Sequence, residues 1–275
     1  MFKLLCTDMD GTLLNDEKEI SNRNLKAVKL AHEKGVKVVV CTGRMFTSAD
    51  FYSDLLKVKA PVVSSNGAFI REKDRDEVIY KGLLGKENCI KVLNICKKYC
   101  IDPNFHTINT IFIEKQTHSA LSYAKFNERL PENKKITIRI VEDWEKIFET
   151  YENEILKCIV VDKDGEKIDK AKIELSKQDS LEVVSSFINN FEVMNRGVSK
   201  GRAVEILAEY YKIKREEIIC IGDNENDISM IKYAGLGVAM KNGEKCVRAA
   251  AKYITDTNNQ DGVAKVIEKF ILNNK

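Results

Sequence analysis

The chain has 275 residues, of which 44% are hydrophobic and 32% are charged, and it contains 3 prolines. This length allows one large core or two domains, and the composition argues against long disordered linkers. The 45 basic and 42 acidic residues leave a net charge of +3 and are mixed along the chain, which argues against a dedicated nucleic-acid or membrane surface.

The first part of the chain alternates strand and helix patterns. Apolar runs predict strands within 2–8, 36–43 and 60–70, the last interrupted by an Asn-Gly turn. Helical patterns predict helices within 21–35, which Ser21 can cap and Gly35 can end, and within 45–59. The strand at 36–43 is apolar almost throughout, as expected when helices cover both faces of a sheet. This βαβαβ order implies an α/β fold with a parallel, doubly wound sheet.

The middle of the chain, from 83 to 188, has a different pattern. It combines a helix at 86–100 and a helix at 165–176 with closely spaced strand-like runs at 110–115, 135–141, 154–162, 181–187 and 191–195. Strands outnumber helices there, which favours an inserted α+β domain with an antiparallel sheet. We therefore expect a core formed by 1–82 and 189–275 and an inserted domain at 83–188.

The alternating pattern of the first part returns after the insert. Helical patterns occur at 199–213, 226–235 and 243–251, and strands are expected at 216–223, 236–240 and 251–255, before a terminal helix. This return indicates that both ends of the chain contribute to one sheet.

The eight cysteines form no C-x-x-C pair, so no zinc ribbon or thioredoxin-like motif is indicated. Several lie in apolar runs, where cysteine acts as a small buried hydrophobe. The N-terminal sequence MFKLLCTDMD reaches acidic residues before any apolar stretch long enough for a signal peptide, and no run approaches the length of a membrane span. We expect a reduced, cytoplasmic protein.

Polar residues gather at or near the carboxyl ends of the expected core strands, where open parallel sheets bind ligands. They are Asp8 and Asp10, Thr42, Lys200, and Asp223 and Asp227. Each is a weak signal alone, but together they supply two pairs of acids, a hydroxyl and an ammonium group. Four converging carboxylates repel one another unless a divalent cation lies among them, and hard oxygen ligands without a nearby histidine indicate Mg²⁺. The hydroxyl, the lysine and backbone N–H groups can then bind a phosphoryl group.

Four motifs carry these residues: DMDGTLL (8–14), CTGR (41–44), SKGRAV (199–204) and GDNENDISM (222–230), with SSNGA at 64–68 as a further feature. In this order they resemble the haloacid dehalogenase-like superfamily of phosphohydrolases, specifically its Cof-type subfamily. The resemblance covers the whole chain, with the insert at the position of the large C2-type cap that sets substrate specificity, and no catalytic position departs from the pattern.

The resemblance implies a role for each catalytic residue. Asp8 would be the nucleophile that forms an aspartyl-phosphate, and Asp10 would be the general acid and then the base for the hydrolytic water. Thr42 and Lys200 would hold the phosphate oxygens and stabilise charge in the transition state. The segment LLNDEKEIS (13–21) would form a flap beside the nucleophile.

The resemblance also implies the binding groups. The phosphate would contact the Met9 and Gly43 amides, Thr42, Lys200 and Asn226, and Arg44 and Asn66 are candidates for a position on the substrate side. The implied Mg²⁺ ligands are Asp8, Asp10 through its backbone carbonyl, Asp223, and Asp227 directly or through water.

These observations favour a Mg²⁺-dependent phosphatase that acts on small phosphorylated metabolites, such as sugar phosphates, FMN or pyridoxal phosphate, as a monomer or homodimer. A phosphomutase of the phosphomannomutase type is an alternative, because it would share the covalent step and return the phosphate to the sugar. A phospho-aspartate signalling module like a receiver domain is a third interpretation, which the chain length and Asp10 disfavour.

Overall fold

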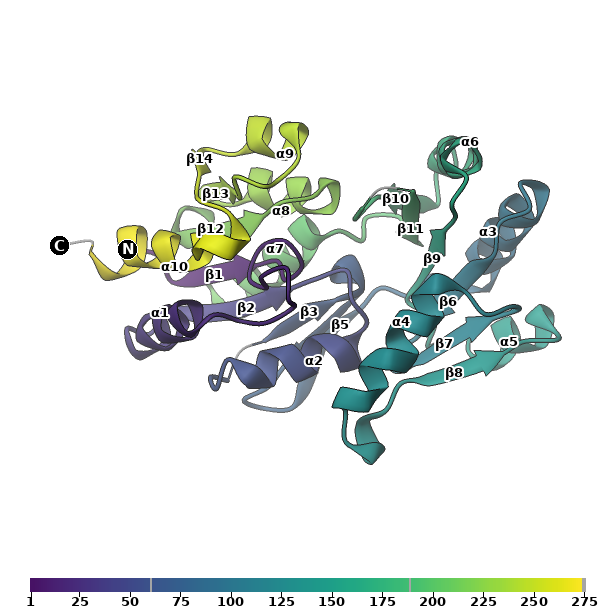
Figure 1. The fold of residues 1–275 in the computed structure, drawn as a ribbon, viewed down its shortest axis with the longest axis horizontal. Coiled ribbons are helices and arrows are strands. Elements are labelled where there is room, and N and C mark those ends of the chain that lie inside the picture. The colour runs from purple at the N-terminus through teal and green to yellow at the C-terminus, as the bar shows by residue number, and fades with distance from the viewer. Residues whose placement is uncertain (60, 188, 274–275) are drawn as a thin grey trace. The chain divides into compact units, whose positions relative to one another are not determined.

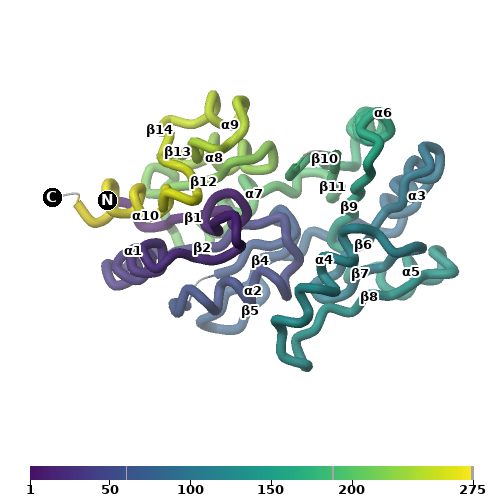
Figure 2. The backbone as a smooth tube through the Cα atoms, in the orientation of Figure 1, coloured from purple at the N-terminus to yellow at the C-terminus, as the bar shows by residue number. Residues whose placement is uncertain are grey.

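The computed structural model describes residues 1–59, 61–187 and 189–273. The chain forms two compact units. The first unit contains 1–44, 49–79 and 199–275, and the second unit contains 45–48 and 80–198. The first unit is therefore built from both ends of the chain, and the purple and yellow segments of Figure 2 lie together in it.

The first unit contains an eight-stranded sheet with the order β14-β13-β12-β1-β2-β3-β4-β5. Neighbours from β14 to β3 pair in parallel, whereas β4 is antiparallel to β3. The strands are β1 (Leu4–Thr7), β2 (Lys37–Cys41), β3 (Val62–Ser64), β4 (Phe69–Glu72), β5 (Glu77–Lys81), β12 (Ile218–Gly222), β13 (Leu236–Ala239) and β14 (Tyr253–Ile254).

Helices accompany this sheet. They are α1 (Asn22–Glu33), α2 (Phe46–Leu55), α7 (Lys200–Tyr211), α8 (Ile228–Tyr233), α9 (Lys245–Ala250) and α10 (Gly262–Ile267), the last continued by a π-helical turn at Glu268–Leu272. Helix α1 packs against α10, and α7 packs against α8 (Figure 1). Every residue of β1 and β12 is buried, as expected for strands in the middle of a sheet that is covered on both faces.

The second unit contains a six-stranded sheet with the order β10-β11-β9-β6-β7-β8. Its pairs are antiparallel except for β7 with β8. The strands are β6 (Pro103–His106), β7 (Thr110–Ile113), β8 (Thr137–Ile140), β9 (Lys157–Val161), β10 (Leu181–Val184) and β11 (Asn190–Asn195), and the helices are α3 (Lys86–Lys98), α4 (His118–Phe126), α5 (Trp144–Thr150) and α6 (Gly165–Ser176). One hydrophobic core joins one face of this sheet to α3, α5 and α6.

The predicted α/β class with a parallel-dominated, doubly wound sheet is confirmed. Ser21 caps α1 by accepting a hydrogen bond from the Asn24 N–H, and Gly35 follows its end with a φ of +82°, as predicted. The run at 60–70 divides into β3, a 3₁₀ turn and β4, and Ala60 lies outside the described residues.

Four elements were not predicted, namely β5, β6, α4 and α5. The segment PNFH of β6 lacks the β-branched alternation that identifies a strand, and it is held by pairing with β7 and β9. The second unit also ends at 198 rather than at 188, because β11 pairs with β9 and β10. Among the described residues, no helix is both long and apolar enough to span a membrane.

Two glycines of the first unit give a test of local packing. Gly35 and Gly67 both have a left-handed backbone, with φ of +82° and +100°, but a Cβ on Gly35 would meet nothing within 4 Å, whereas a Cβ on Gly67 would collide with the Ser199 carbonyl. We expect Gly35→Ala to lower the free energy of unfolding by about 1 kcal/mol. Gly67→Ala should lower it by roughly 3 kcal/mol, because the collision adds to the backbone strain. Urea denaturation measures the free energy of unfolding of both variants. Equal losses would show that the backbone φ alone, and not the collision, sets the cost of adding a Cβ.

Candidate active site

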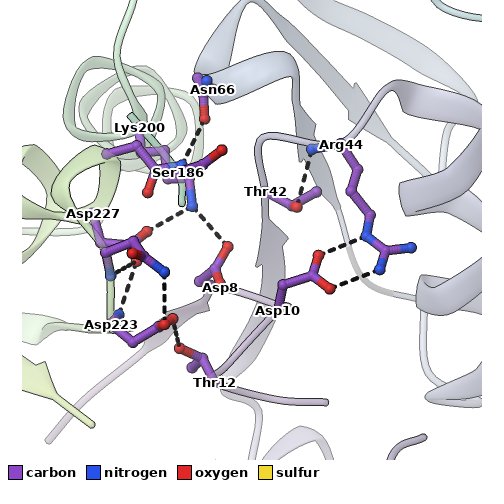
Figure 3. Close-up of polar contacts among 12 residues, drawn as sticks. Asp8, Asp10, Thr12, Thr42, Arg44, Asn66, Ser186, Lys200, Asp223 and Asp227 are labelled. Carbon is purple, nitrogen blue, oxygen red and sulfur yellow. Dashed lines mark hydrogen bonds and ion pairs between the residues drawn. The ribbon is translucent and has the colours of Figure 1, made fainter. Parts of the chain in front are cut away.

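The ends of β1 and β12 bring two acidic segments together. The strands pair in parallel with Thr7 opposite Ile221, so the residues that follow them, Asp8 and Asp223, emerge at the same edge of the sheet. The Asp8 N–H donates to the Ile221 carbonyl over 2.9 Å, which continues the ladder by one bond. Segments more than two hundred residues apart therefore place their carboxylates side by side (Figure 3).

Lys200 provides the positive charge of the site. It is the first residue of α7, whose N-cap Ser199 accepts a hydrogen bond from the Arg202 N–H. Its buried Nζ lies 2.7 Å from Asp8 Oδ1 and 2.6 Å from Asp227 Oδ1 (Figure 3). Because Lys200 is paired with two carboxylates, its pKa is raised even though burial alone would lower it.

Three carboxylates form a cluster around this lysine. Asp8, Asp223 and Asp227 are buried, and each offers an oxygen within 4.8 Å of the others. Burial and the two neighbouring carboxylates raise the pKa of Asp223 to about 9. Burial and Asp227 raise the pKa of Asp8 to about 7, although contact with Lys200 opposes the rise. The negative charge of the cluster exceeds what one lysine balances, so the donor set fits a hard divalent cation such as Mg²⁺.

Neighbouring groups orient these carboxylates. The Thr12 hydroxyl donates to Asp223 Oδ1 over 2.7 Å, and the Asn224 amide donates to Asp223 Oδ2 over 2.8 Å. Asp227 Oδ2 accepts from the backbone N–H groups of Asp223 and Asn224 over 2.9 and 3.1 Å. Thr12 and Asn224 were not among the predicted site residues, although they lie within the motifs DMDGTLL and GDNENDISM.

Asp10 has a different environment from Asp8. Its half-buried carboxylate accepts two hydrogen bonds from the Arg44 guanidinium, over 2.6 and 2.7 Å, and one from Lys18 over 2.9 Å. Burial works to raise the pKa of Asp10, but the bonds and charges of Arg44 and Lys18 outweigh it and hold the pKa well below its usual range. Its carboxylate is not part of the three-carboxylate cluster.

The predicted phosphate-binding residues occupy loops that are tied to one another. Thr42 follows β2, its N–H donates to the Val63 carbonyl over 2.9 Å, and its hydroxyl accepts from the Arg44 N–H over 3.1 Å. The Asn66 N–H donates to the Thr42 carbonyl over 3.1 Å, and Asn66 Oδ1 accepts from the Asn226 amide over 3.0 Å. Asn66 thus connects the Thr42 loop with the loop of Asn226.

The two amides predicted to contact phosphate, those of Met9 and Gly43, follow Asp8 and Thr42 directly. The Met9 side chain is buried, and its carbonyl accepts from the Thr12 and Leu14 N–H groups over 3.2 and 2.8 Å. These bonds fold residues 9–14 into a tight loop beside Asp8.

The similarity of this chain to known proteins shows which family of enzymes it belongs to. The sequence model of the haloacid dehalogenase-like hydrolase family matches residues 5–267. The chain therefore belongs to this family, within its Cof-type branch. It is 32% identical over 270 residues to the 5-amino-6-(5-phospho-D-ribitylamino)uracil phosphatase YcsE of Bacillus subtilis, covering 98% of this chain and 96% of that protein.

Two solved structures are similar over nearly the whole chain. A haloacid dehalogenase-like hydrolase from Bacteroides thetaiotaomicron has a TM-score of 0.81 at 31% identity, covering 98% of this chain and 99% of that chain. A sugar phosphatase of subclass IIB of the superfamily has a TM-score of 0.79 at 25% identity, covering 98% of each chain. The family and its phosphatase members identify the chain as a phosphoric monoester hydrolase.

Removal of one carboxylate tests whether the cluster of Asp8, Asp223 and Asp227 binds a divalent cation. Without divalent cations at pH 7, Asp223→Asn should be more stable than the wild type by roughly 1–2 kcal/mol, because folding of the wild type must protonate Asp223, whose pKa is raised to about 9, whereas an amide needs no proton. Addition of Mg²⁺ should raise the melting temperature of the wild type but not that of the variant, since only the wild type keeps the full ligand set. Differential scanning calorimetry with EDTA or Mg²⁺ measures both effects.

The matched control is Asp169→Asn, at an exposed position of α6, which should behave like the wild type in both conditions. Equal stabilisation of the wild type and Asp223→Asn by Mg²⁺ would contradict the assignment of Asp223 as a ligand.

Proposed function

We propose that this protein is a Mg²⁺-dependent phosphatase of small phosphorylated metabolites that acts through an aspartyl-phosphate on Asp8. One observation carries the proposal: a buried lysine lies between Asp8 and Asp227, next to a third carboxylate, Asp223. Such a site can hold a cation and the anionic phosphoryl group together, which is the arrangement that phosphoryl transfer requires.

The carboxylates of Asp8, Asp223 and Asp227, with the Asp10 backbone carbonyl, would hold the Mg²⁺. These are the hard oxygen ligands that Mg²⁺ prefers, and burial and mutual repulsion raise the pKa values of Asp8 and Asp223, a cost that a bound cation would offset. When bound, the ion would neutralise the phosphate and bring it close to a negatively charged nucleophile.

Asp8 would attack phosphorus in line with the ester oxygen. A bond forms between a carboxylate oxygen of Asp8 and phosphorus as the bond from phosphorus to the ester oxygen breaks, and the electron pair of that bond leaves with the alcohol oxygen. Lys200 contacts Oδ1 of Asp8 and would orient the carboxylate while it stabilises the equatorial oxygens of the transition state. Thr42, Asn226 and the Met9 and Gly43 amides would bind the remaining phosphate oxygens.

Asp10 would give a proton to the departing oxygen and then remove one from the water that hydrolyses the aspartyl-phosphate. In this structure Arg44 and Lys18 hold Asp10 in its ionised form. Their contacts must weaken before Asp10 can take up a proton. An incoming anionic ester would compete for these two cations, which couples substrate binding to the acid step.

The substrates that we propose are sugar phosphates and phosphorylated cofactors such as FMN or pyridoxal phosphate. Similarity to a phosphatase named for a ribityl-phosphate compound and to a sugar phosphatase supports this class. We propose that the second unit is the cap that selects the leaving group. The eight free cysteines fit a reducing cytoplasm as its place of action.

The nucleophile is tested by Asp8→Asn. An amide cannot attack phosphorus, so release of p-nitrophenol from p-nitrophenyl phosphate with Mg²⁺ should fall by at least about 10³-fold, while the fold is retained. Absorbance assays measure the rate, and circular dichroism checks the fold, with Asp169→Asn as the active control. Persistent turnover in Asp8→Asn would remove Asp8 from the mechanism. Formation of hexose 6-phosphate from a hexose 1-phosphate, without free phosphate, would instead favour a mutase.

The acid and base roles of Asp10 are tested by Asp10→Asn. Nitrophenolate leaves without a proton, so this variant should still form the aspartyl-phosphate from p-nitrophenyl phosphate but hydrolyse it slowly. Stopped-flow measurements should show a burst of nitrophenol close to one equivalent per active site, which the wild type lacks. Alkyl phosphates, which need the acid, should lose roughly 10²-fold or more in the first step. Equal losses for both esters without a burst would argue against these roles.

A further inference from the structure

Two asparagine side chains from the C-terminal part of the chain bind the loop that carries Asp10. The Asn242 amide donates to the Gly11 carbonyl over 2.8 Å, and the Asn258 amide donates to the Leu14 carbonyl over 3.1 Å. Gly11 directly follows Asp10, and Leu14 pairs with Asp10 in an isolated β-bridge. The two amides therefore bind the loop at the two backbone positions that are most closely tied to Asp10.

The two asparagines are also bonded to each other and to the segment of Asp223. The Asn258 N–H donates to Asn242 Oδ1 over 3.0 Å. Two residues after Asn242, the Glu244 N–H donates to the Asp223 carbonyl over 2.9 Å. Asn242 follows β13 and Asn258 follows β14, and all of these residues belong to the first unit. The ends of two core strands thus connect the loop of Asp10 with the loop of Asp223.

Asn258 makes a second contact further along the same loop. Its amide donates to Asp16 Oδ1 over 3.0 Å. The neighbouring Asn259 accepts from the Asp16 N–H over 3.0 Å and donates to Asp16 Oδ2 over 2.8 Å. Lys18, two residues after Asp16, forms an ion pair with Asp10. The contacts with Asp16 therefore also help to place a charged partner of the Asp10 carboxylate.

Asp8 is held by contacts of a different kind. Its N–H continues the ladder of the sheet by donating to the Ile221 carbonyl, and its carboxylate lies 2.7 Å from the buried Nζ of Lys200. Neither contact involves the two asparagines. Loss of their amides should therefore displace Asp10 much more than Asp8.

We propose that Asn242 and Asn258 are positioning residues for Asp10 in the phosphatase reaction. Proton transfer requires the two groups to lie within hydrogen-bond reach, so a small displacement of the loop slows the steps in which Asp10 gives or removes a proton. The attack of Asp8 on phosphorus does not need Asp10 when the leaving group departs without a proton. This inference rests on the proposed function and on the role of Asp10 in it.

The test compares p-nitrophenyl phosphate with phenyl phosphate in Asn242→Ala and Asn258→Ala. The two esters have similar shapes, but phenolate is the poorer leaving group and depends more on a proton donor. Asn242 is exposed and Asn258 is buried, so Asn242→Ala decides the question if Asn258→Ala does not fold. The matched control is Gln260→Ala, which removes an exposed amide from the same 3₁₀ turn as Asn258.

Both variants should keep kcat/KM for p-nitrophenyl phosphate within about threefold of the wild type, since this ratio reports only the steps up to departure of nitrophenolate. Their kcat and KM for this ester should fall together, roughly tenfold, because the aspartyl-phosphate is hydrolysed slowly and accumulates. Stopped-flow measurements should then show a burst of nitrophenol. For phenyl phosphate, kcat/KM should fall roughly tenfold. Gln260→Ala should match the wild type on both esters.

A merely structural role of the two asparagines predicts a different pattern. Equal losses of kcat/KM on both esters without a burst, or wild-type kinetics in both variants, would overturn the inference while the phosphatase function stands. A wild type that releases phosphate from neither ester would overturn the proposed function itself. Absence of a burst in Asp10→Asn would overturn the proposed role of Asp10, and the inference with it. Thermal melting of each variant separates a loss of folding from a loss of positioning.

Discussion

The contact of one buried ammonium group with two buried carboxylates is the interaction on which the site depends. Asp8, Asp223 and Asp227 lie within 4.8 Å of one another, an arrangement that would be strongly unfavourable in isolation. Lys200 offsets part of that repulsion because α7 begins at the same edge of the sheet. The parallel pairing of β1 with β12 brings the acids together. The electrostatics of the site therefore depend directly on the architecture of the sheet.

The same loop gives two aspartates opposite environments. Asp8 is buried among carboxylates, and its pKa rises to about 7, whereas Asp10 is bound by Arg44 and Lys18, which lower its pKa. Two carboxylates whose environments shift their pKa values apart are suited to two different roles. Asp8 is paired with Lys200, whereas Asp10 is paired with Arg44 and Lys18. The difference between the proposed nucleophile and the proposed acid therefore comes from the neighbouring side chains, rather than from the two residues themselves.

Much of the first unit could be predicted because its signals are local. The largely apolar strands β1, β2 and β12 and the polar residues that follow them identify a parallel sheet with a site at its edge, and Ser21 and Gly35 mark the ends of α1. Other features depend on partners far along the chain. The strand β6 is fixed by pairing with β7 and β9, and the second unit extends to 198 because β11 joins its sheet. The roles of Thr12 and Asn224 follow from contacts with Asp223 that no spacing encodes.

This contrast explains why the reaction class is easier to infer than the substrate. Chemistry on a phosphoryl group requires particular residue types immediately after particular strands, so it leaves short motifs in the sequence. The second unit, which we propose selects the leaving group, carries no comparable motif, because its polar side chains come from separate strands. His106, Lys157 and Glu192 come from three strands and are brought together only by register. In the sequence each stands alone and resembles an ordinary strand residue. Among the described residues, the buried imidazole of His106 is found to lack a hydrogen-bond partner only when the sheet is assembled.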